Sequence, residues 1–303
     1  MGRVEHSLAV MQSSYLFING IRTHYLHWNL EDGGQPVLLL HGLASNARIW
    51  EAVAPNLVDA GLVPIAPDAR AHGLTDKPDG SYGFDVYLRD LATFVDAAQL
   101  EKPLLVGHSW GGLLALEFAA RFHIGLRAPT GLVLVDGGFT QMDQAPGANW
   151  EETRRRLTPP RLAGTSVESF LSTLAHPSRK WQPDDQAVQA ILANFEISPD
   201  ELIYPRLSLE RHLQILRSIW EYQTYESFGQ VRCPVLAVPT SPPGPLDENE
   251  QTYLDLKRQG ISKAQASIGE LQVRWMEDTV HDIPLQRPTE LAGLILDFHA
   301  HIS

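Results

Sequence analysis

A serine flanked by glycines stands out at residues 107–112, where the sequence reads Gly-His-Ser-Trp-Gly-Gly. It follows the apolar run 104–106 and precedes a second apolar segment, 113–122. The first run predicts a strand and the second a buried helix, so Ser109 falls on a tight strand-to-helix turn. Such a turn strains the backbone at the serine and requires small residues on both sides of it. A serine hydroxyl that is held outward in this way is typical of the nucleophile in acyl transfer.

A histidine near the end of the chain could activate this serine. His281 follows the last predicted strand and precedes the helix predicted over 288–299. An imidazole, whose ordinary pKa is about 6.5, can accept the serine proton at neutral pH and return it to a leaving group. We therefore expect His281 to act as the general base. His72 lies on a turn that precedes the serine, and we expect it to support the structure instead.

Two aspartates are candidates for the acid that orients the imidazole. Asp136 ends the apolar run 132–135, whereas Asp247 lies a few residues beyond the run 235–238. A carboxylate that accepts a hydrogen bond from the imidazole Nδ1–H fixes the tautomer of the ring. We favour Asp136 and keep Asp247 as the runner-up. A third interpretation is that Asp136 only caps the Gly137-Gly138 turn.

Taken together, these motifs resemble those of the α/β-hydrolase superfamily. The resemblance is carried by residues 107–112, by His-Gly-Leu-Ala-Ser-Asn-Ala-Arg-Ile-Trp at 41–50 and by Val-His-Asp-Ile-Pro-Leu-Gln-Arg-Pro at 280–288. It implies an eight-stranded, mostly parallel sheet, a helical cap after the sixth strand, and the order Ser, acid, His along the chain. It also implies that the N–H groups of Leu43 and Trp110 form an oxyanion hole. Most members of the family carry the acid after the seventh strand, where this chain has a proline-rich segment instead.

The apolar runs of the sequence predict the sheet that must position these side chains. Short runs alternate with helical patterns, as expected when crossover helices bury parallel strands on both faces. Asn19-Gly20 separates two further runs, and this dipeptide favours a two-residue hairpin. We therefore expect an α/β fold with eight strands, at 15–19, 23–28, 37–40, 62–66, 104–106, 132–135, 235–238 and 271–276.

The strand pattern stops between about residues 140 and 230, where the sequence shows helical patterns interrupted by prolines. An insertion between two strands of a sheet should lie outside the sheet, over the strand ends. We expect a core formed by 1–139 and 231–303 and a helical cap formed by 140–230. Aromatic residues of this cap could line an acyl pocket, but we expect most of them to pack in the cap's own small core.

Composition excludes several classes of function. The chain has 24 basic and 36 acidic residues and a net charge of −12, which disfavours nucleic acid and anionic membranes as partners. Arg154, Arg155 and Arg156 form a dense basic run, which we interpret as a solvated helix face. With Cys233 as the single cysteine, neither an internal disulfide nor a cysteine metal cluster is possible. We expect a cytoplasmic monomer or homodimer without a membrane span.

These observations predict a serine hydrolase that cleaves a carboxylic ester or a related small-molecule acyl compound through an acyl-enzyme intermediate. The predicted mechanism requires no cofactor and no metal. Hydrolysis of a carbon–carbon bond, perhydrolysis and acyl transfer are alternatives that the same triad could perform. An alternative of another class is a ligand-binding, receptor-like module with weak turnover, which the displaced acid leaves open.

Overall fold

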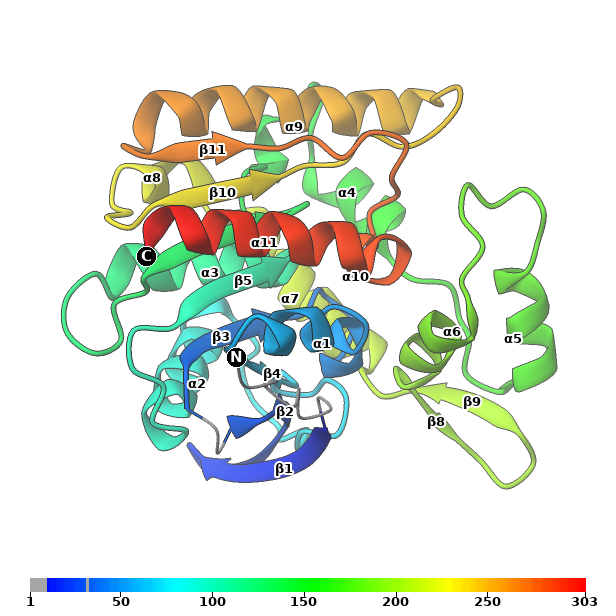
Figure 1. Cartoon of the computed structure of the whole chain (residues 1–303). Helices are drawn as coiled ribbons and strands as arrows, with labels where there is room; N and C mark the ends of the chain where they lie inside the picture. Colours follow the sequence, from blue (N-terminus) through cyan, green and yellow to red (C-terminus); the bar gives the residue numbers. More distant parts are fainter. Residues whose placement is uncertain (1–9, 31–32) are drawn as a thin grey trace, which may run out of the picture.

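The computed structural model describes residues 10–30 and 33–303, so residues 1–9 of the expected core lie outside the described part. Eight strands form one sheet in the order β1-β2-β4-β3-β5-β6-β10-β11 (Figure 1). β1 and β2 are antiparallel, β2 and β4 are antiparallel, and the remaining neighbours are parallel. The predicted fold class is therefore confirmed. The strands are β1 Met11–Ile18, β2 Ile21–Trp28, β3 Gln35–Leu40, β4 Leu62–Pro67, β5 Leu104–His108, β6 Gly131–Val135, β10 Val235–Val238 and β11 Leu271–Val273.

The hairpin between β1 and β2 turns at Asn19 and Gly20, as the sequence predicts. Both residues have positive φ angles, 47° and 79°. A two-residue turn of this hand matches the right-handed twist of the strands that it joins, and it requires residues that tolerate positive φ. The asparagine-glycine pair therefore sets the register of the first two strands.

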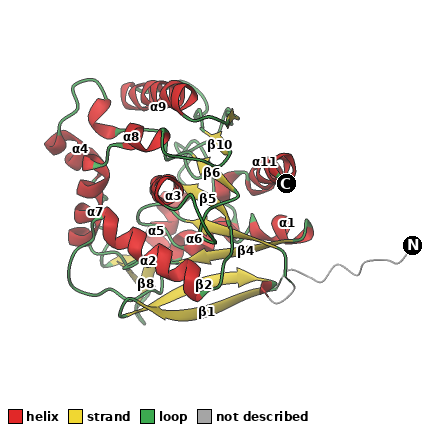
Figure 2. Cartoon of the chain, turned by 90° about the vertical axis from the view of Figure 1, so that its left-hand side faces the viewer, coloured by secondary structure: helices red, strands yellow, loops and turns green. Residues whose placement is uncertain are grey.

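Helices cover both faces of the sheet (Figure 2). One apolar cluster joins α2 Phe84–Ala97, α3 Trp110–Arg121, α8 Thr224–Phe228 and α9 Glu248–Ser267 to one face. A second cluster packs α1 Ala54–Asp59 and α11 Pro288–Ile302 against the other face. Every residue of β5 and β6 is buried, because these central strands are covered on both sides. None of the helices in the described part of the chain is long and apolar enough to cross a bilayer.

The segment between β6 and β10 forms helices beside the sheet, together with a small sheet of its own. The helices are α4 Trp150–Leu157, α5 Val167–Leu174, α6 Asp185–Leu192 and α7 Leu209–Glu221. The strands β7 Thr165–Ser166, β8 Phe195–Ile197 and β9 Leu202–Pro205 pair antiparallel in the order β7-β9-β8. The sequence analysis did not predict this sheet, because strands of two to four residues are too short to show alternation.

This segment has a small apolar core of its own. Phe170, Leu174, Phe195 and Ile203 are buried together, and the rings of Phe170 and Phe195 meet edge to face at 4.9 Å. The short helix α8 differs from the rest of the segment, because it packs against α3 and α9 of the main sheet. Its Phe228 is fully buried in the apolar cluster on that face.

α9 connects the parallel strands β10 and β11, and it approaches the loop after β6 closely. A Cβ atom built on Gly260 would lie 1.7 Å from the carbonyl oxygen of Phe139. Any larger residue would have to separate the two backbones. The absence of a side chain at this position therefore lets α9 lie directly against the loop that follows β6.

Replacing Gly260 by alanine is expected to destabilise the fold by roughly 3 kcal/mol, because the added methyl group meets main chain that cannot rotate away. The matched control is Gly293→Ala in α11, where an added Cβ meets nothing within 4 Å. That change should stabilise the helix by up to about 1 kcal/mol, because alanine is the better helix former. Urea unfolding of both variants gives the comparison, and equal free energies of unfolding would contradict the close approach.

Candidate active site

Ser109 lies between β5 and α3 in a strained backbone conformation. Its φ of 55° and ψ of −119° lie outside the regions that non-glycine residues ordinarily adopt. Glycine is required at positions 107 and 111, because a side chain at either position would overlap the neighbouring backbone. A Cβ on Gly107 would lie 2.3 Å from the carbonyl oxygen of Gly111, and a Cβ on Gly111 would lie 2.5 Å from that of Leu40. The tight turn therefore holds the serine at the carboxyl end of the central strand.

Asp136 and His281 are joined by a short hydrogen bond. The imidazole Nδ1–H donates to Oδ2 of Asp136 over 2.7 Å. Asp136 is fully buried at the end of β6, whereas the imidazole side chain is 41% exposed. Burial by itself would lower the pKa of His281, but the hydrogen bond and the negative charge of Asp136 outweigh it, so this pKa lies above its ordinary value. The carboxylate thus stabilises the protonated imidazole.

The carboxylate of Asp136 has two further donors. Thr240 N–H donates to Oδ1 over 2.9 Å, and the ammonium group of Lys257 lies 2.7 Å from Oδ1 and 2.9 Å from Oδ2. Burial would raise the pKa of Asp136, but the bond from His281 and the charge of Lys257 hold it well below its usual range. Asp136 is therefore ionised near neutral pH.

Asp247 lies elsewhere and has a different local role. Its exposed side chain accepts the N–H of Glu250 over 2.8 Å, and Glu250 returns a bond to the N–H of Asp247. This reciprocal pair is a capping box at the start of α9. The geometry therefore favours Asp136 over Asp247 as the partner of His281.

The loop that contains Leu43 lies against the serine. A Cβ built on Gly42 would lie 3.2 Å from the Cβ of Ser109. Leu43 and Trp110 line the same cavity as Ser109. Within the described part of the chain, neither backbone N–H of these two residues has an acceptor. Both amides are thus free to donate to an oxygen atom bound beside Ser109.

Two buried histidines hold this loop in place. His41 donates from Nδ1 to the carbonyl oxygen of Gly42 over 2.8 Å and accepts the N–H of Ala69 at Nε2 over 3.0 Å. His72 accepts the N–H of Ala44 at Nε2 over 3.3 Å. Burial, followed by the nearby His41, lowers the pKa of His72 to about 3, so this imidazole is neutral. As expected from the sequence, His72 supports the structure.

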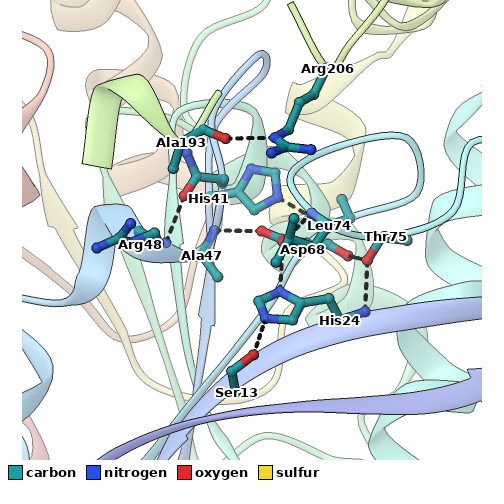
Figure 3. Close-up of polar contacts among 12 residues, drawn as sticks. Ser13, His24, His41, Ala47, Arg48, Asp68, Leu74, Thr75, Ala193 and Arg206 are labelled. Atoms are coloured by element: carbon teal, nitrogen blue, oxygen red, sulfur yellow. Dashed lines mark hydrogen bonds and ion pairs between the residues drawn. The ribbon is translucent and has the colours of Figure 1, made fainter. Parts of the chain in front are cut away.

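Asp68 connects the same region to the first strands (Figure 3). Its carboxylate accepts the N–H groups of Ala47 and Leu74 over 2.7 and 2.8 Å, and it lies 2.7 Å from Nδ1 of His24. His24 in turn contacts the hydroxyl of Ser13 over 2.9 Å. These contacts hold the turn after β4 against the loop after β3.

A further buried histidine, His108, supports the loop that carries His281. His108 immediately precedes Ser109, and its Nε2–H donates to the carbonyl oxygen of His281 over 2.9 Å. Burial, together with the nearby His281, lowers the pKa of His108 to about 4. His108 is therefore a neutral donor that fixes the loop carrying His281.

One cavity of about 450 Å³ is lined by the candidate nucleophile, base and acid and by the two residues with free amides. Ser109, Asp136 and His281 line it together with residues of α4, α7 and α9. Among the described residues, no hydrogen bond joins the Ser109 hydroxyl to the imidazole of His281. In hydrolases without bound substrate such a bond is often long and tightens only in the substrate complex. The cavity therefore brings the predicted nucleophile and base to one space.

Sequence reasoning missed Lys257. On α9 it shares a buried stripe with Leu254, Ile261 and Ala264, at helical spacing. A lysine on an apolar stripe is the signal that could have identified it, because buried ammonium groups are almost always paired.

In the described part of the chain, no group of three or more His, Cys, Asp or Glu residues is arranged to hold a metal ion.

Comparison with known proteins agrees with this arrangement. Residues 37–294 match the model of a family described as the alpha/beta hydrolase family. A 112-residue stretch is 36% identical to the AB hydrolase superfamily protein YfhM of Bacillus subtilis and covers 36% of this chain and 39% of that protein. A 100-residue stretch is 41% identical to 2-hydroxy-6-oxo-2,4-heptadienoate hydrolase of Pseudomonas putida and covers 31% of this chain and 36% of that protein. The matched stretches thus span about a third of these relatives.

Solved structures extend the similarity to nearly the whole chain. An E-2-(acetamidomethylene)succinate hydrolase superposes with a TM-score of 0.73 and 20% identity, covering 96% of this chain and all of that one. A thioesterase domain from the curacin biosynthetic pathway superposes with a TM-score of 0.70 and 20% identity, covering 95% of this chain and 99% of that one. At this level of identity the comparison concerns the fold alone.

Proposed function

The chain belongs to the alpha/beta hydrolase family, and we propose that it is a serine hydrolase that cleaves a carboxylic ester or a related acyl compound. The observation that carries the proposal is the 2.7 Å bond between Asp136 and His281 in the cavity that also holds Ser109. An oriented imidazole beside a strained, outward-held serine is the arrangement that acyl transfer requires.

In the first half of the proposed reaction, Oγ of Ser109 attacks the carbonyl carbon of the substrate while Nε2 of His281 takes the hydroxyl proton. The carbonyl oxygen becomes an oxyanion that accepts the N–H groups of Leu43 and Trp110. One such donor is typically worth about 3 to 4 kcal/mol of transition-state stabilisation. The tetrahedral intermediate then expels the alcohol, which takes the proton from His281 and leaves an acyl group on Ser109.

In the second half, water replaces the alcohol. His281 takes a proton from water, the resulting hydroxide attacks the acyl carbon, and the collapse of the second tetrahedral intermediate returns that proton to Oγ of Ser109. The products are a carboxylic acid and the free enzyme. Asp136 remains ionised throughout and stabilises the imidazolium that forms in each half.

The relatives support hydrolysis as the shared chemistry. They include a haloalkane dehalogenase of Mesorhizobium japonicum, which is 40% identical over 88 residues that cover 29% of this chain and 28% of that protein, and the heptadienoate hydrolase described above. These names describe the cleavage of different bonds, so the choice of an acyl bond rests on Ser109 at the turn after β5. A serine nucleophile forms an acyl-enzyme, which carries the proposal to esters and related acyl compounds.

A fluorophosphonate is expected to label Ser109 stoichiometrically, because the probe reacts with a serine that an imidazole activates. Mass spectrometry of the tryptic peptides locates the adduct. Ser109→Ala should abolish labelling, whereas Ser172→Ala, which removes an exposed serine of α5, should retain it. Absence of an adduct on Ser109 would refute the assignment of Ser109 as the nucleophile. Labelling without turnover of any p-nitrophenyl ester would favour the receptor-like alternative.

Asp136→Asn is expected to lower kcat by roughly 10³- to 10⁴-fold, because an amide no longer stabilises the imidazolium or holds its tautomer. Asp247→Asn keeps a residue that caps helices well, so kcat should stay within about twofold of the wild-type value. The kcat of both variants is measured by steady-state hydrolysis of p-nitrophenyl butyrate. The rates are divided by the number of active sites counted with the fluorophosphonate. A larger loss in Asp247→Asn would overturn the assignment of the acid.

A further inference from the structure

The cavity that Ser109 lines has an excess of positive charge once its ion pairs are counted. Asp136 is paired with Lys257, and Glu250, the other carboxylate of the cavity wall, is paired with Lys180 over 2.7 Å. Arg156 lines the same cavity and forms no ion pair among the described residues, although its charge also acts on Glu152, four residues earlier on α4. The wall therefore has one guanidinium without an ion-pair partner in the described part of the chain.

Arg156 differs from its two neighbours on α4 in the direction it faces. Arg154 and Arg155 pair with Glu151 and Glu152, three residues earlier, on the exposed side of the helix. The residue three positions before Arg156 is Thr153, which is buried. Helical spacing places Arg156 on the face of α4 that carries Thr153, where its exposed side chain lines the cavity without an ion pair among the described residues. The expectation of a solvated basic run is confirmed, because all three arginines are exposed.

A neighbouring cavity has the same sign of charge. This cavity of about 670 Å³ shares His212 with the first, and among the described residues that line it the arginines are Arg161 and Arg206, with no lysine or carboxylate. Neither arginine has a carboxylate partner within the described part of the chain, and Arg206 donates to the carbonyl oxygen of Ala193 over 3.2 Å. Burial and then the charge of Arg206 lower the pKa of nearby Lys77. A chain with a net charge of −12 thus places three arginines that form no ion pair among the described residues around these two adjoining cavities.

We propose that the acyl substrate carries an anionic group, in the simplest case a carboxylate, and that Arg156 binds it while Ser109 attacks the acyl carbon. This inference rests on the proposed serine hydrolase function. A guanidinium presents two parallel N–H donors that match the two oxygens of a carboxylate. Arg161 and Arg206 add attraction from the neighbouring cavity, and low-dielectric walls concentrate such a field.

A matched pair of substrates tests the proposal. Mono-p-nitrophenyl glutarate carries a free carboxylate, and methyl p-nitrophenyl glutarate is its neutral analogue. The wild type is expected to hydrolyse the anionic ester with at least roughly tenfold higher kcat/KM. Arg156→Gln should lower this ratio by about tenfold, mainly through KM, and Arg155→Gln on the outer side of α4 should leave it unchanged. Added sodium chloride should also lower the ratio.

A wild-type preference for the neutral ester, or equal ratios in wild type and Arg156→Gln, would overturn the role of Arg156. An equal fall of the ratio in both arginine variants would do the same, because it would indicate a diffuse surface field. Failure of the proposed function itself looks different: neither ester would be hydrolysed and the fluorophosphonate would not label Ser109.

A second inference rests on a different observation, the buried ammonium group behind Asp136. Lys257 is 3% exposed and has acceptors for all of its donors. Besides Asp136, its Nζ donates to the carbonyl oxygen of Thr240 over 3.0 Å and to the hydroxyl oxygen of Thr240 over 2.9 Å. It also lies 4.9 Å from the ring centre of Tyr253. These contacts fix the position of the ammonium.

The titratable groups that face His281 compete over its protonation. Asp136 and Asp282 favour the imidazolium, and the positive charge of Lys257 opposes it. His108, the remaining group, is neutral near pH 7, because its pKa is lowered to about 4. Without Lys257, only burial would oppose the effect of the two carboxylates on the pKa of His281.

We infer that Lys257 is a positioning residue: it holds the carboxylate of Asp136 in place and keeps His281 from binding a proton too tightly to act as a base near neutral pH. Both effects reach the substrate only through Asp136 and His281. A residue that merely stabilised the fold would affect the amount of active protein, whereas Lys257 should also affect the pH dependence of each active site.

The pH profile of kcat/KM tests this inference. In the wild type, activity should rise with pH through a pKa above 6.5, because His281 must lose its proton to act as a base and Asp136 raises its pKa. Lys257→Met removes the opposing charge, so the rise should shift upward by roughly one pH unit. Thr240→Val removes one acceptor of the same ammonium and keeps the charge, so its rise should stay at the wild-type pH.

Active sites are counted with the fluorophosphonate, so that loss of folded protein is separated from a shifted profile. If Lys257→Met does not fold, Lys257→Gln provides the same test, because it keeps a donor for Asp136 and loses the charge. An unshifted profile in the folded variant, or a shift to lower pH, would overturn the inference. An equal upward shift in Thr240→Val would also contradict it.

Discussion

The arrangement of this site depends on one buried carboxylate. Asp136 ends the central strand β6 with its side chain fully inside the protein, where an unpaired charge would be very costly. Its oxygens are satisfied by His281, Lys257 and the N–H of Thr240, which belong to three different parts of the chain. The requirement to satisfy this charge therefore ties the loop after β11, helix α9 and the end of β10 to one point.

The parallel sheet explains why these groups meet. His108 of β5 pairs with Val135 of β6, so the residues that follow, Ser109 and Asp136, leave the same edge of the sheet on adjacent strands. The two loops are also joined directly, since a Cβ on Gly137 would lie 2.1 Å from the carbonyl oxygen of Ser109. Glycines at these contacts let the backbones approach, and the imidazole of His281 then reaches Asp136 from the far end of the chain.

The segment between β6 and β10 contributes α4 and α7 to the walls of the cavity at this edge. Its own core is small, and its cavity walls combine apolar side chains with arginines that have no carboxylate partners in the described structure. In the proposed function, the ends of the main sheet supply Ser109, Asp136 and His281, and α4 supplies the arginine that binds the anionic group of the substrate.

The sequence by itself determined the fold class, all eight strands of the main sheet, and the turn that strains Ser109. These features depend on local patterns, such as apolar runs bounded by turn residues and glycines beside a serine. Local patterns could not decide between Asp136 and Asp247, because both follow predicted strands and the distance to His281 is set by tertiary packing. The partners of Lys257 were likewise decided only by the tertiary structure, since identical residue types on an amphipathic helix differ in role only by what packs against each face. The short strands of the cap escaped prediction for a related reason, because their pairing, more than their own two to four residues, makes them strands.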